Sequence, residues 1–206
     1  MLAYVFWHQP REQAAVGAYE DALVSFHRSL ARSLPVGTRA SASFRVAELP
    51  WLVTSAFAAE GSAPAVEGGY EDWYLVDDFA ALGVLNEAAV GRGHQTTHDE
   101  VAHRFGAGAG GLYGLIEGEP CADALGGATT AVWVARPAGS ERRGLGEMLG
   151  DGMEPARASL WRRQLVFGPA PEFCLLAEEA PAGVAAARLP AGWSATVLDR
   201  EVLWSG

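Results

Sequence analysis

The sequence predicts an α+β fold made of two tandem halves, each with the element order β-α-β-β-α-β. One observation is an internal repeat: residues 70–78 (YEDWYLVDD) return in fainter form in residues 171–179 (PEFCLLAEE). The other is that the hydrophobic pattern around each copy runs through the same order of strands and helices. A gapless alignment sets Asp72 on Glu172, Trp73 on Phe173, Leu75 on Leu175, Val76 on Leu176 and Asp78 on Glu178.

The first half opens with the clearest signals. Residues 2–7 are an apolar run that predicts a strand, ended by Pro10. Residues 14–32 carry apolar side chains at helical spacing, which predicts an amphipathic helix. The further elements expected here are a strand at 41–47, a surface loop at 50–69, a strand at 73–76, a helix at 79–90 capped by Asp77 or Asp78, a short helix at 97–105, a flexible turn at 106–111 and a strand at 112–116.

The second half repeats this order in a shorter form. Its expected elements are a strand at 132–135, a short helix at 141–149, a strand at 160–167, the second copy of the repeat, a degenerate helix at 180–192 and a strand at 196–204. We expect a first half at residues 1–120, with the long loop and a histidine-rich segment, and a shortened second half at residues 129–206. Residues 119–128 would link them.

Composition narrows the classes of function. The chain has 206 residues and a net charge of −10, with few clustered cations, which argues against nucleic acid as a partner. All fifteen basic residues are arginine, so lysine Schiff-base chemistry and a P-loop lysine are excluded. The two cysteines predict no disulfide framework. Neither a signal peptide nor a membrane-spanning run is expected, so we predict a cytoplasmic protein, as a monomer or homodimer.

The β-α-β-β-α-β order is the ferredoxin-like arrangement, in which helices cover one face of an antiparallel sheet. Two such sheets can bury their bare faces against each other and close an antiparallel α+β barrel. On this element order and repeat, the chain resembles the dimeric α+β barrel superfamily, with both halves fused. The resemblance implies a cavity between the sheets for a small hydrophobic molecule or haem. Family members include cofactor-free monooxygenases, haem-degrading enzymes and chlorite-dismutase-like proteins.

The densest polar cluster contains three histidines, His94, His98 and His103. His94 and His98 are four residues apart, a spacing that places two metal ligands on one helix face. The spacing of five to His103 departs from a single-face triad, and a solvated loop at a helix start explains the same residues. The cluster is therefore a candidate metal site with a plain structural alternative.

The ligand-binding candidates are His8, Arg45, Trp73, Trp133 and Arg162. His8 shares a strand face with Tyr4 and Phe6, and either meets a ligand inside the barrel or lies at its wetted rim. Arg45 and Arg162 occupy equivalent places in the repeat, so each either binds a carboxylate or pairs with Asp72 and Glu172 on neighbouring strands. The tryptophans are expected in the core, where some would line a cavity.

Nucleophile and phosphate-binding motifs are absent from the sequence. The function best matching these observations is the binding of a hydrophobic or planar small molecule between the halves, with monooxygenase-like chemistry as its enzymatic form. One alternative is a non-catalytic structural or assembly protein with a filled barrel. A second is a haem- or metal-binding protein, although no motif specifies haem as a cofactor. The catalytic residues stay unassigned at this stage.

Overall fold

The computed structural model describes residues 1–11, 14–53, 68–91, 93–137, 139, 158–164, 171–179 and 189–206. Within these residues the chain forms both strands and helices, as the predicted α+β class requires. In chain order they are β1 (Leu2–Pro10), α1 (Val16–Arg32), β2 (Thr38–Val46), α2 (Pro50–Val53), β3 (Gly69–Val76), α3 (Phe79–Gly91), α4 (Gln95–Ala102), β4 (Phe105–Glu117), α5 (Ala122–Gly127), β5 (Thr130–Ala135), β6 (Ala158–Arg163), β7 (Phe173–Ala177) and β8 (Ser194–Ser205).

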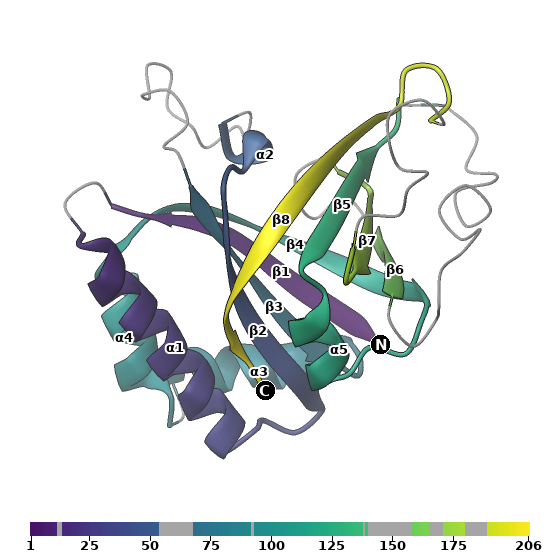
Figure 1. Ribbon diagram of the computed structural model, residues 1–206. Helices are drawn as coiled ribbons and strands as arrows, with labels where there is room; N and C mark the ends of the chain where they lie inside the picture. Colours follow the sequence, from purple (N-terminus) through teal and green to yellow (C-terminus); the bar gives the residue numbers. More distant parts are fainter. Residues whose placement is uncertain are drawn as a thin grey trace.

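The strands form one closed antiparallel barrel in the order β1-β3-β2-β8-β5-β7-β6-β4 (Figure 1). Strands β4, β1, β3 and β2 are neighbours, and β8, β5, β7 and β6 make up the rest of the circle. The pairing of β2 with β8 and of β4 with β6 joins these two groups. Closure gives each of these strands a partner on both sides, which protects the backbone groups that an open sheet edge would expose.

Helices α1, α3 and α4 lie along one side of the barrel, outside strands β1 to β4 (Figure 1). The buried face of α1 presents Tyr19, Leu23, Phe26 and Leu30, which are part of the helical pattern predicted for this segment. Helix α3 begins where Asp78 Oδ1 accepts a hydrogen bond from the Ala81 N–H at 2.9 Å, so Asp78 is the capping acid. These helices cover the outer face of the sheet.

The interior of the barrel is filled by large side chains. Trp7, Trp73, Trp133 and Trp161 point inward and are at most 1% exposed. Trp7 and Trp133 have ring centroids 5.0 Å apart, and Trp73 and Trp161 have centroids 5.6 Å apart. Trp51 of α2 packs against Trp7 at 5.5 Å. Side chains with almost no accessible surface adjoin no space for a water molecule, so this described part of the interior is a packed core.

A buried carboxylate, Glu71, organises the tryptophan core. It accepts hydrogen bonds from the indole N–H groups of Trp7, Trp73 and Trp133 at 2.9, 2.8 and 3.1 Å. The Arg200 guanidinium supplies the opposite charge, with Nε 3.2 Å from Glu71 Oε1, and both side chains are fully buried. A charge inside a protein requires this kind of pairing, because the interior solvates ions poorly.

Residues 106–111, which were predicted to be a flexible turn, are part of β4 and pair with β1. The glycines there permit a close approach of large side chains. A Cβ atom at Gly110 would lie 2.6 Å from the Tyr4 hydroxyl, and one at Gly108 would lie 2.8 Å from the Phe6 ring. The prediction was wrong because these glycines leave room for aromatic neighbours and do not break the strand.

The gapless alignment of residues 70–78 with residues 171–179 matches positions that lie on opposite strand faces. Trp73 faces the barrel interior, whereas Phe173 belongs to a cluster on the outer face, with its ring 6.4 Å from that of Trp193. Successive strand residues point to opposite faces, so a shift of one residue moves every side chain to the other side of the sheet. The gapless alignment therefore sets inward-facing residues of β3 against outward-facing residues of β7.

Two segments contain helices that were not predicted. Helix α2 begins the segment expected to be a loop at 50–69, and α5 lies in the expected linker at 119–128. The helix predicted at 141–149, the end of the strand predicted at 160–167 and most of the degenerate helix at 180–192 lie outside the described residues. Cys174 of β7 is buried, and burial raises the pKa of its thiol well above the ordinary value.

Candidate functional site

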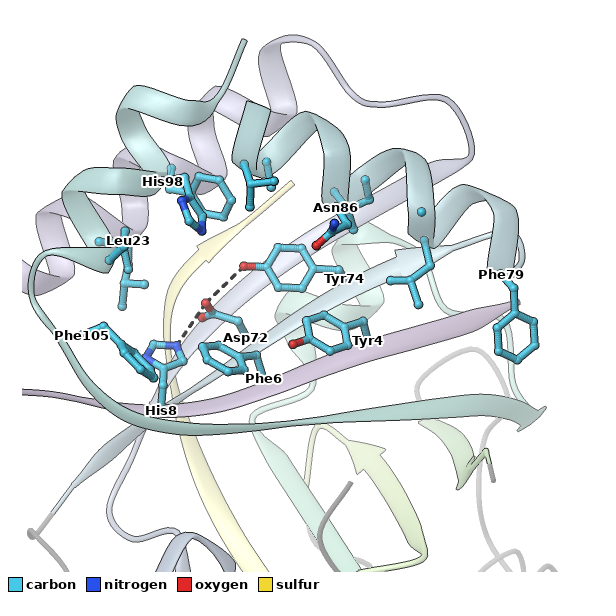
Figure 2. A pocket seen from close by; sticks show the side chains of 18 residues that line it. Tyr4, Phe6, His8, Leu23, Asp72, Tyr74, Phe79, Asn86, His98 and Phe105 are labelled. Atoms are coloured by element: carbon cyan, nitrogen blue, oxygen red, sulfur yellow. Dashed lines mark hydrogen bonds and ion pairs between the residues drawn. The ribbon is translucent and has the colours of Figure 1, made fainter. Parts of the chain in front are cut away.

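A cavity of about 750 Å³ lies between the outer face of the barrel and the helices that cover it (Figure 2). This volume is in the range of pockets that hold drug-sized molecules. We call this cavity the outer pocket. It is lined by Tyr4, Phe6, His8, Leu23, Phe26, Asp72, Tyr74, Phe79, Leu82, Gly83, Leu85, Asn86, Ala89, Val90, His98, Val101, Ala102 and Phe105.

Strand alternation selects the residues that reach the outer pocket. Tyr4, Phe6 and His8 are every second residue of β1, and all three line it. Asp72 and Tyr74 are the corresponding positions of β3, in register with Phe6 and Tyr4. The residues between them on each strand point into the tryptophan core. His8 therefore faces the helix layer, neither the barrel interior nor a wetted rim, and is 1% exposed.

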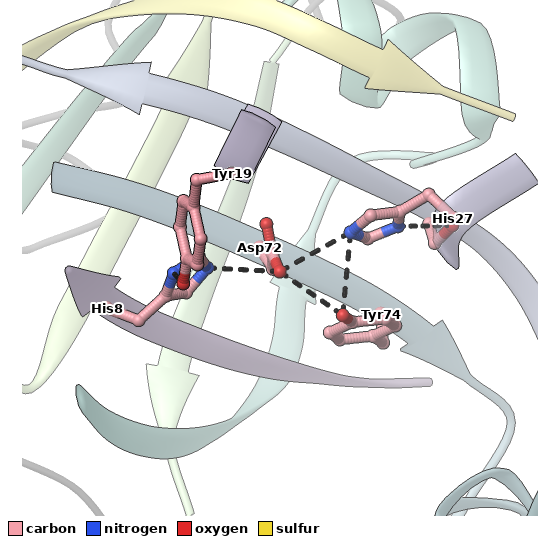
Figure 3. A network of polar contacts seen from close by, with 6 residues as sticks. His8, Tyr19, His27, Asp72 and Tyr74 are labelled. Carbon is pink, nitrogen blue, oxygen red and sulfur yellow. Dashed lines mark hydrogen bonds and ion pairs between the residues drawn. The ribbon is translucent and has the colours of Figure 1, made fainter. Parts of the chain in front are cut away.

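The Asp72 carboxylate lies between two imidazoles at the floor of the outer pocket (Figure 3). Its Oδ2 atom is 3.1 Å from Nε2 of His8 and 3.4 Å from Nε2 of His27, which is on α1. The Tyr74 hydroxyl donates to the same oxygen at 3.3 Å. All three contacts thus converge on one carboxylate oxygen.

Each imidazole is held by a second contact from its Nδ1 atom. His8 Nδ1 lies 2.7 Å from the Tyr19 hydroxyl, and His27 Nδ1 lies 2.9 Å from Oγ of Ser41. These contacts fix the orientation of both rings, as a hydrogen-bonded second partner does for functional histidines. The resulting network ties α1, β1, β2 and β3 together beneath the helices.

Burial and charge set the protonation of this network. Burial alone would raise the pKa of Asp72, but the charges and hydrogen bonds of His8 and His27 outweigh it and hold the pKa well below the ordinary value. Burial, with the nearby charge of Asp72, raises the pKa of Tyr19 and of Tyr74. Asp72 therefore stays ionised and the two phenols keep their protons at neutral pH.

The opposite wall of the outer pocket comes from the helices and is mainly apolar. Asn86 projects into the pocket from α3, and His98 lines it from α4 (Figure 2). The His98 ring packs edge-on against Phe26 at 5.8 Å, and its Nδ1 lies 3.3 Å from Oδ1 of Asp99. A ligand in this space would contact hydrocarbon over most of its surface and a few polar groups at the floor and the rim.

The predicted histidine cluster is dispersed by the structure. His94 is buried and its Nδ1 is 2.8 Å from the Ser29 hydroxyl, His98 lines the outer pocket, and His103 is exposed at the end of α4. In the described part of the chain, no three His, Cys, Asp or Glu side chains form a group that could hold a metal ion. The spacing of four predicted a shared helix face, but His94 stands just before the helix begins.

The structure does not pair Arg45 with Asp72 or Arg162 with Glu172, which was one of the two alternatives for these arginines. Arg45 pairs with Glu20 of α1 at 2.8 Å and with Glu201 of β8 at 2.5 Å, while Asp72 faces the histidines. Glu172 pairs with Arg136 at 2.5 Å. Arg162 is half-buried on β6, in register with Gly114 and Phe173. Neither arginine lines the outer pocket.

Trp73 and Trp133, the two tryptophans named as ligand contacts, belong to the packed core inside the barrel. Of the predicted ligand-binding residues, only His8 reaches the outer pocket. The sequence did not predict that Asp72 lines this pocket, nor that Asp72 contacts His8 and His27. A signal for His27 was present, since it follows Tyr19 and Leu23 at helical spacing and so lies on the buried face of α1.

The described residues on the outer face of β5, β6 and β7 contrast with this polar network. The residues packed there on β5, β6 and β7 form an apolar cluster of Val132, Val134, Leu160, Phe173 and Leu175. Among the residues that the structure describes, the acid–imidazole network draws its members from β1, α1, β2 and β3.

Comparison with known proteins finds no family model and no curated protein that this chain matches. Among the described residues, none of the helices combines the length and the apolar character that crossing a membrane requires.

Proposed function

We propose that the protein binds a mainly apolar small molecule in the outer pocket, with the His8–Asp72–His27 network as the polar end of the site. The observation that carries this proposal is a buried, ionised carboxylate that lines a cavity with mostly hydrocarbon walls. A few convergent polar groups in an apolar pocket are typical of small-molecule sites. The site thus lies outside the barrel. The described tryptophan core fills the interior and serves as the scaffold.

An enzymatic form of this function is a second candidate, supported by the geometry of His8. A carboxylate on one ring nitrogen and a phenol on the other orient the imidazole, as in general acid–base sites. In this form the network would accept a proton from a bound molecule, which is a step compatible with the monooxygenase-like chemistry implied by the family resemblance.

We also propose that the barrel consists of two fused ferredoxin-like halves, as in the dimeric α+β barrel superfamily. The strand orders β4-β1-β3-β2 and β8-β5-β7-β6 support this, because they have the same sequence of first, second, third and fourth strands. The registers are consistent with it. If Trp7 is matched to Trp133, then Glu71, which lies opposite Trp7, corresponds to Cys174, which lies opposite Trp133. Phe44 then corresponds to Trp161, because Phe44 pairs with Glu71 and Trp161 pairs with Cys174.

This register equivalence indicates which half of the chain would carry the functional site. It matches Asp72 to Leu175 and His8 to Val134, both of which are buried in the apolar outer cluster. A duplicated fold that keeps its polar network in one half only is the pattern expected when that half carries the site.

Blocking the outer pocket tests the proposal. Gly83 of α3 lines the pocket, and a Cβ atom added there meets no other atom within 4 Å. Gly91, at the end of the same helix, has equally open surroundings but is not part of the pocket lining. Gly83→Trp should therefore abolish binding of a neutral apolar dye such as Nile red, measured by its fluorescence, whereas Gly91→Trp should leave it unchanged. Equal binding by both variants, or none by the unmodified protein, would contradict the proposal.

A further inference from the structure

The two oxygens of the Asp72 carboxylate are used very differently. Oδ2 has the contacts with His8, His27 and Tyr74. Oδ1 is buried and accepts no hydrogen bond from any described residue. A buried carboxylate oxygen without a donor is costly, because it has lost water and gained nothing in exchange. Asp72 lines the outer pocket, and Figure 2 shows its side chain directed into that space between His8 and Tyr74.

We infer that the natural ligand is an uncharged, mainly apolar molecule whose hydroxyl or N–H group donates a hydrogen bond to Oδ1 of Asp72. This inference rests on the proposed function and specifies the chemical class of its ligand. An ionised carboxylate can only accept hydrogen bonds, so the ligand group that contacts Oδ1 must be the hydrogen-bond donor. An anionic ligand is excluded by repulsion from Asp72.

The absence of charge on the ligand follows from the surroundings of the carboxylate. Two imidazoles already face Asp72 within 3.5 Å, so the carboxylate has partners within the protein. A ligand cation would have to lose its water against walls formed by Phe6, Phe26 and Leu23, where ions are poorly solvated. A neutral donor satisfies Oδ1 without this cost.

The shape of the ligand is constrained by rings on β1 and β4. The rings of Phe6 and His8 are stacked at 5.1 Å, those of Tyr4 and Phe6 at 6.3 Å, and those of Phe6 and Phe105 at 5.8 Å. All four residues line the outer pocket. A rigid aromatic ring system bearing one donor matches this row and the neighbouring carboxylate better than a flexible chain does, because it loses less conformational freedom on binding.

Four compounds with one ring system test this inference: naphthalene, a naphthol, a naphthoate and a naphthylmethylamine. Affinities would be measured by ligand-detected NMR titration of the full chain at neutral pH. We expect the naphthol to bind roughly ten-fold or more tightly than naphthalene, the size of a hydrogen bond to a charged acceptor. We expect the naphthoate to bind most weakly and the amine to bind less tightly than the naphthol.

Variants of the protein test whether the preference for naphthol over naphthalene depends on Asp72. Asp72→Asn should reduce the preference for naphthol over naphthalene, and Asp77→Asn, at an exposed carboxylate paired with Arg39, should preserve it. If Asp72→Asn does not fold, the ligand series on the unmodified protein still decides the question.

Each outcome has one meaning. Equal affinities for naphthol and naphthalene, or tighter binding of the amine or naphthoate, would overturn the inference while leaving a small-molecule pocket in place. Failure of the whole series, together with failure of Nile red, would overturn the proposed function itself.

Discussion

Nε2 of His8 lies 3.1 Å from Oδ2 of Asp72, on neighbouring antiparallel strands and beneath a layer of helices that excludes solvent from both side chains. This contact lies at the floor of the outer pocket, and both side chains line that pocket. It lies on the outer side of the barrel wall, while the inner side of the same two strands holds Trp7, Glu71 and Trp73. One wall therefore carries a packed scaffold on one face and the candidate site on the other.

The depressed pKa of Asp72 predicts an acid-dependent loss of stability. Its folded-state pKa lies below the ordinary value of 3.8, so the unfolded chain binds more protons between those two values. The stabilisation is complete above 3.8 and is lost as the pH falls from 3.8 towards the folded-state pKa. Urea unfolding at a series of acidic pH values should show this decline in the unmodified protein and a shallower one in Asp72→Asn. Parallel curves for the two proteins would contradict the assigned network.

The five tyrosines of the chain should resist alkaline titration together. Burial is the largest cause of the raised pKa of Tyr4, Tyr19, Tyr70, Tyr74 and Tyr113. For Tyr70 the pKa rises from 10.0 to about 12. Because folding keeps these protons bound, stability should be complete below pH 10.0 and fall as the pH rises through that interval. Phenolate absorbance should therefore appear late and together with unfolding. A normal titration of several tyrosines in the folded protein would contradict this packing.

Glu71→Gln should destabilise the protein strongly. The substitution keeps the shape of the side chain but leaves Arg200 as a buried cation without its counter-charge. Breaking a buried pair in this way typically costs about 3–5 kcal/mol of unfolding free energy. The exposed Glu48→Gln change is the matched control and should cost little. Denaturant unfolding measures both, and similar values for the two variants would show that Glu71 does not organise the tryptophan core.

Much of the element order could be predicted from the sequence, because amphipathic periodicity and proline or glycine boundaries are local signals. Helix α1 is the clearest case. The glycine-rich part of β4 could not be predicted in the same way, since the reason for its glycines is the Tyr4 and Phe6 side chains of a strand about a hundred residues away. The gapless alignment set Trp73 against Phe173, which face opposite ways, for a similar reason: residue type does not reveal which side of the sheet a strand residue faces.

The site was predictable only in part. His8, Tyr4 and Phe6 were placed on one strand face by their alternation, and the structure confirms that all three line one pocket. The partner of Asp72 was not predictable, since an arginine on one neighbouring strand and histidines on another strand and a helix were both compatible with the sequence. The choice depends on three-dimensional packing of α1 over β3, which brings His27 to within 3.4 Å of the carboxylate.

Gly110→Ala should disturb the outer pocket through Tyr4. The added Cβ would lie 2.6 Å from the Tyr4 hydroxyl and 2.8 Å from its ring, so the ring must move. Overpacking of this kind costs about 1–3 kcal/mol of stability. We expect the folded variant to bind naphthol more weakly, as measured by NMR titration. Gly91→Ala, in open surroundings on α3, is the control. Unchanged naphthol affinity in Gly110→Ala would exclude Tyr4 from the binding surface.

A crystal structure of the protein with a bound naphthol tests the central claim most directly. Our account predicts the ring system in the outer pocket, between β1 and α3, with the hydroxyl within hydrogen-bonding distance of Oδ1 of Asp72. A naphthol bound inside the barrel or on its surface, with the outer pocket left empty at saturating concentration, would contradict it.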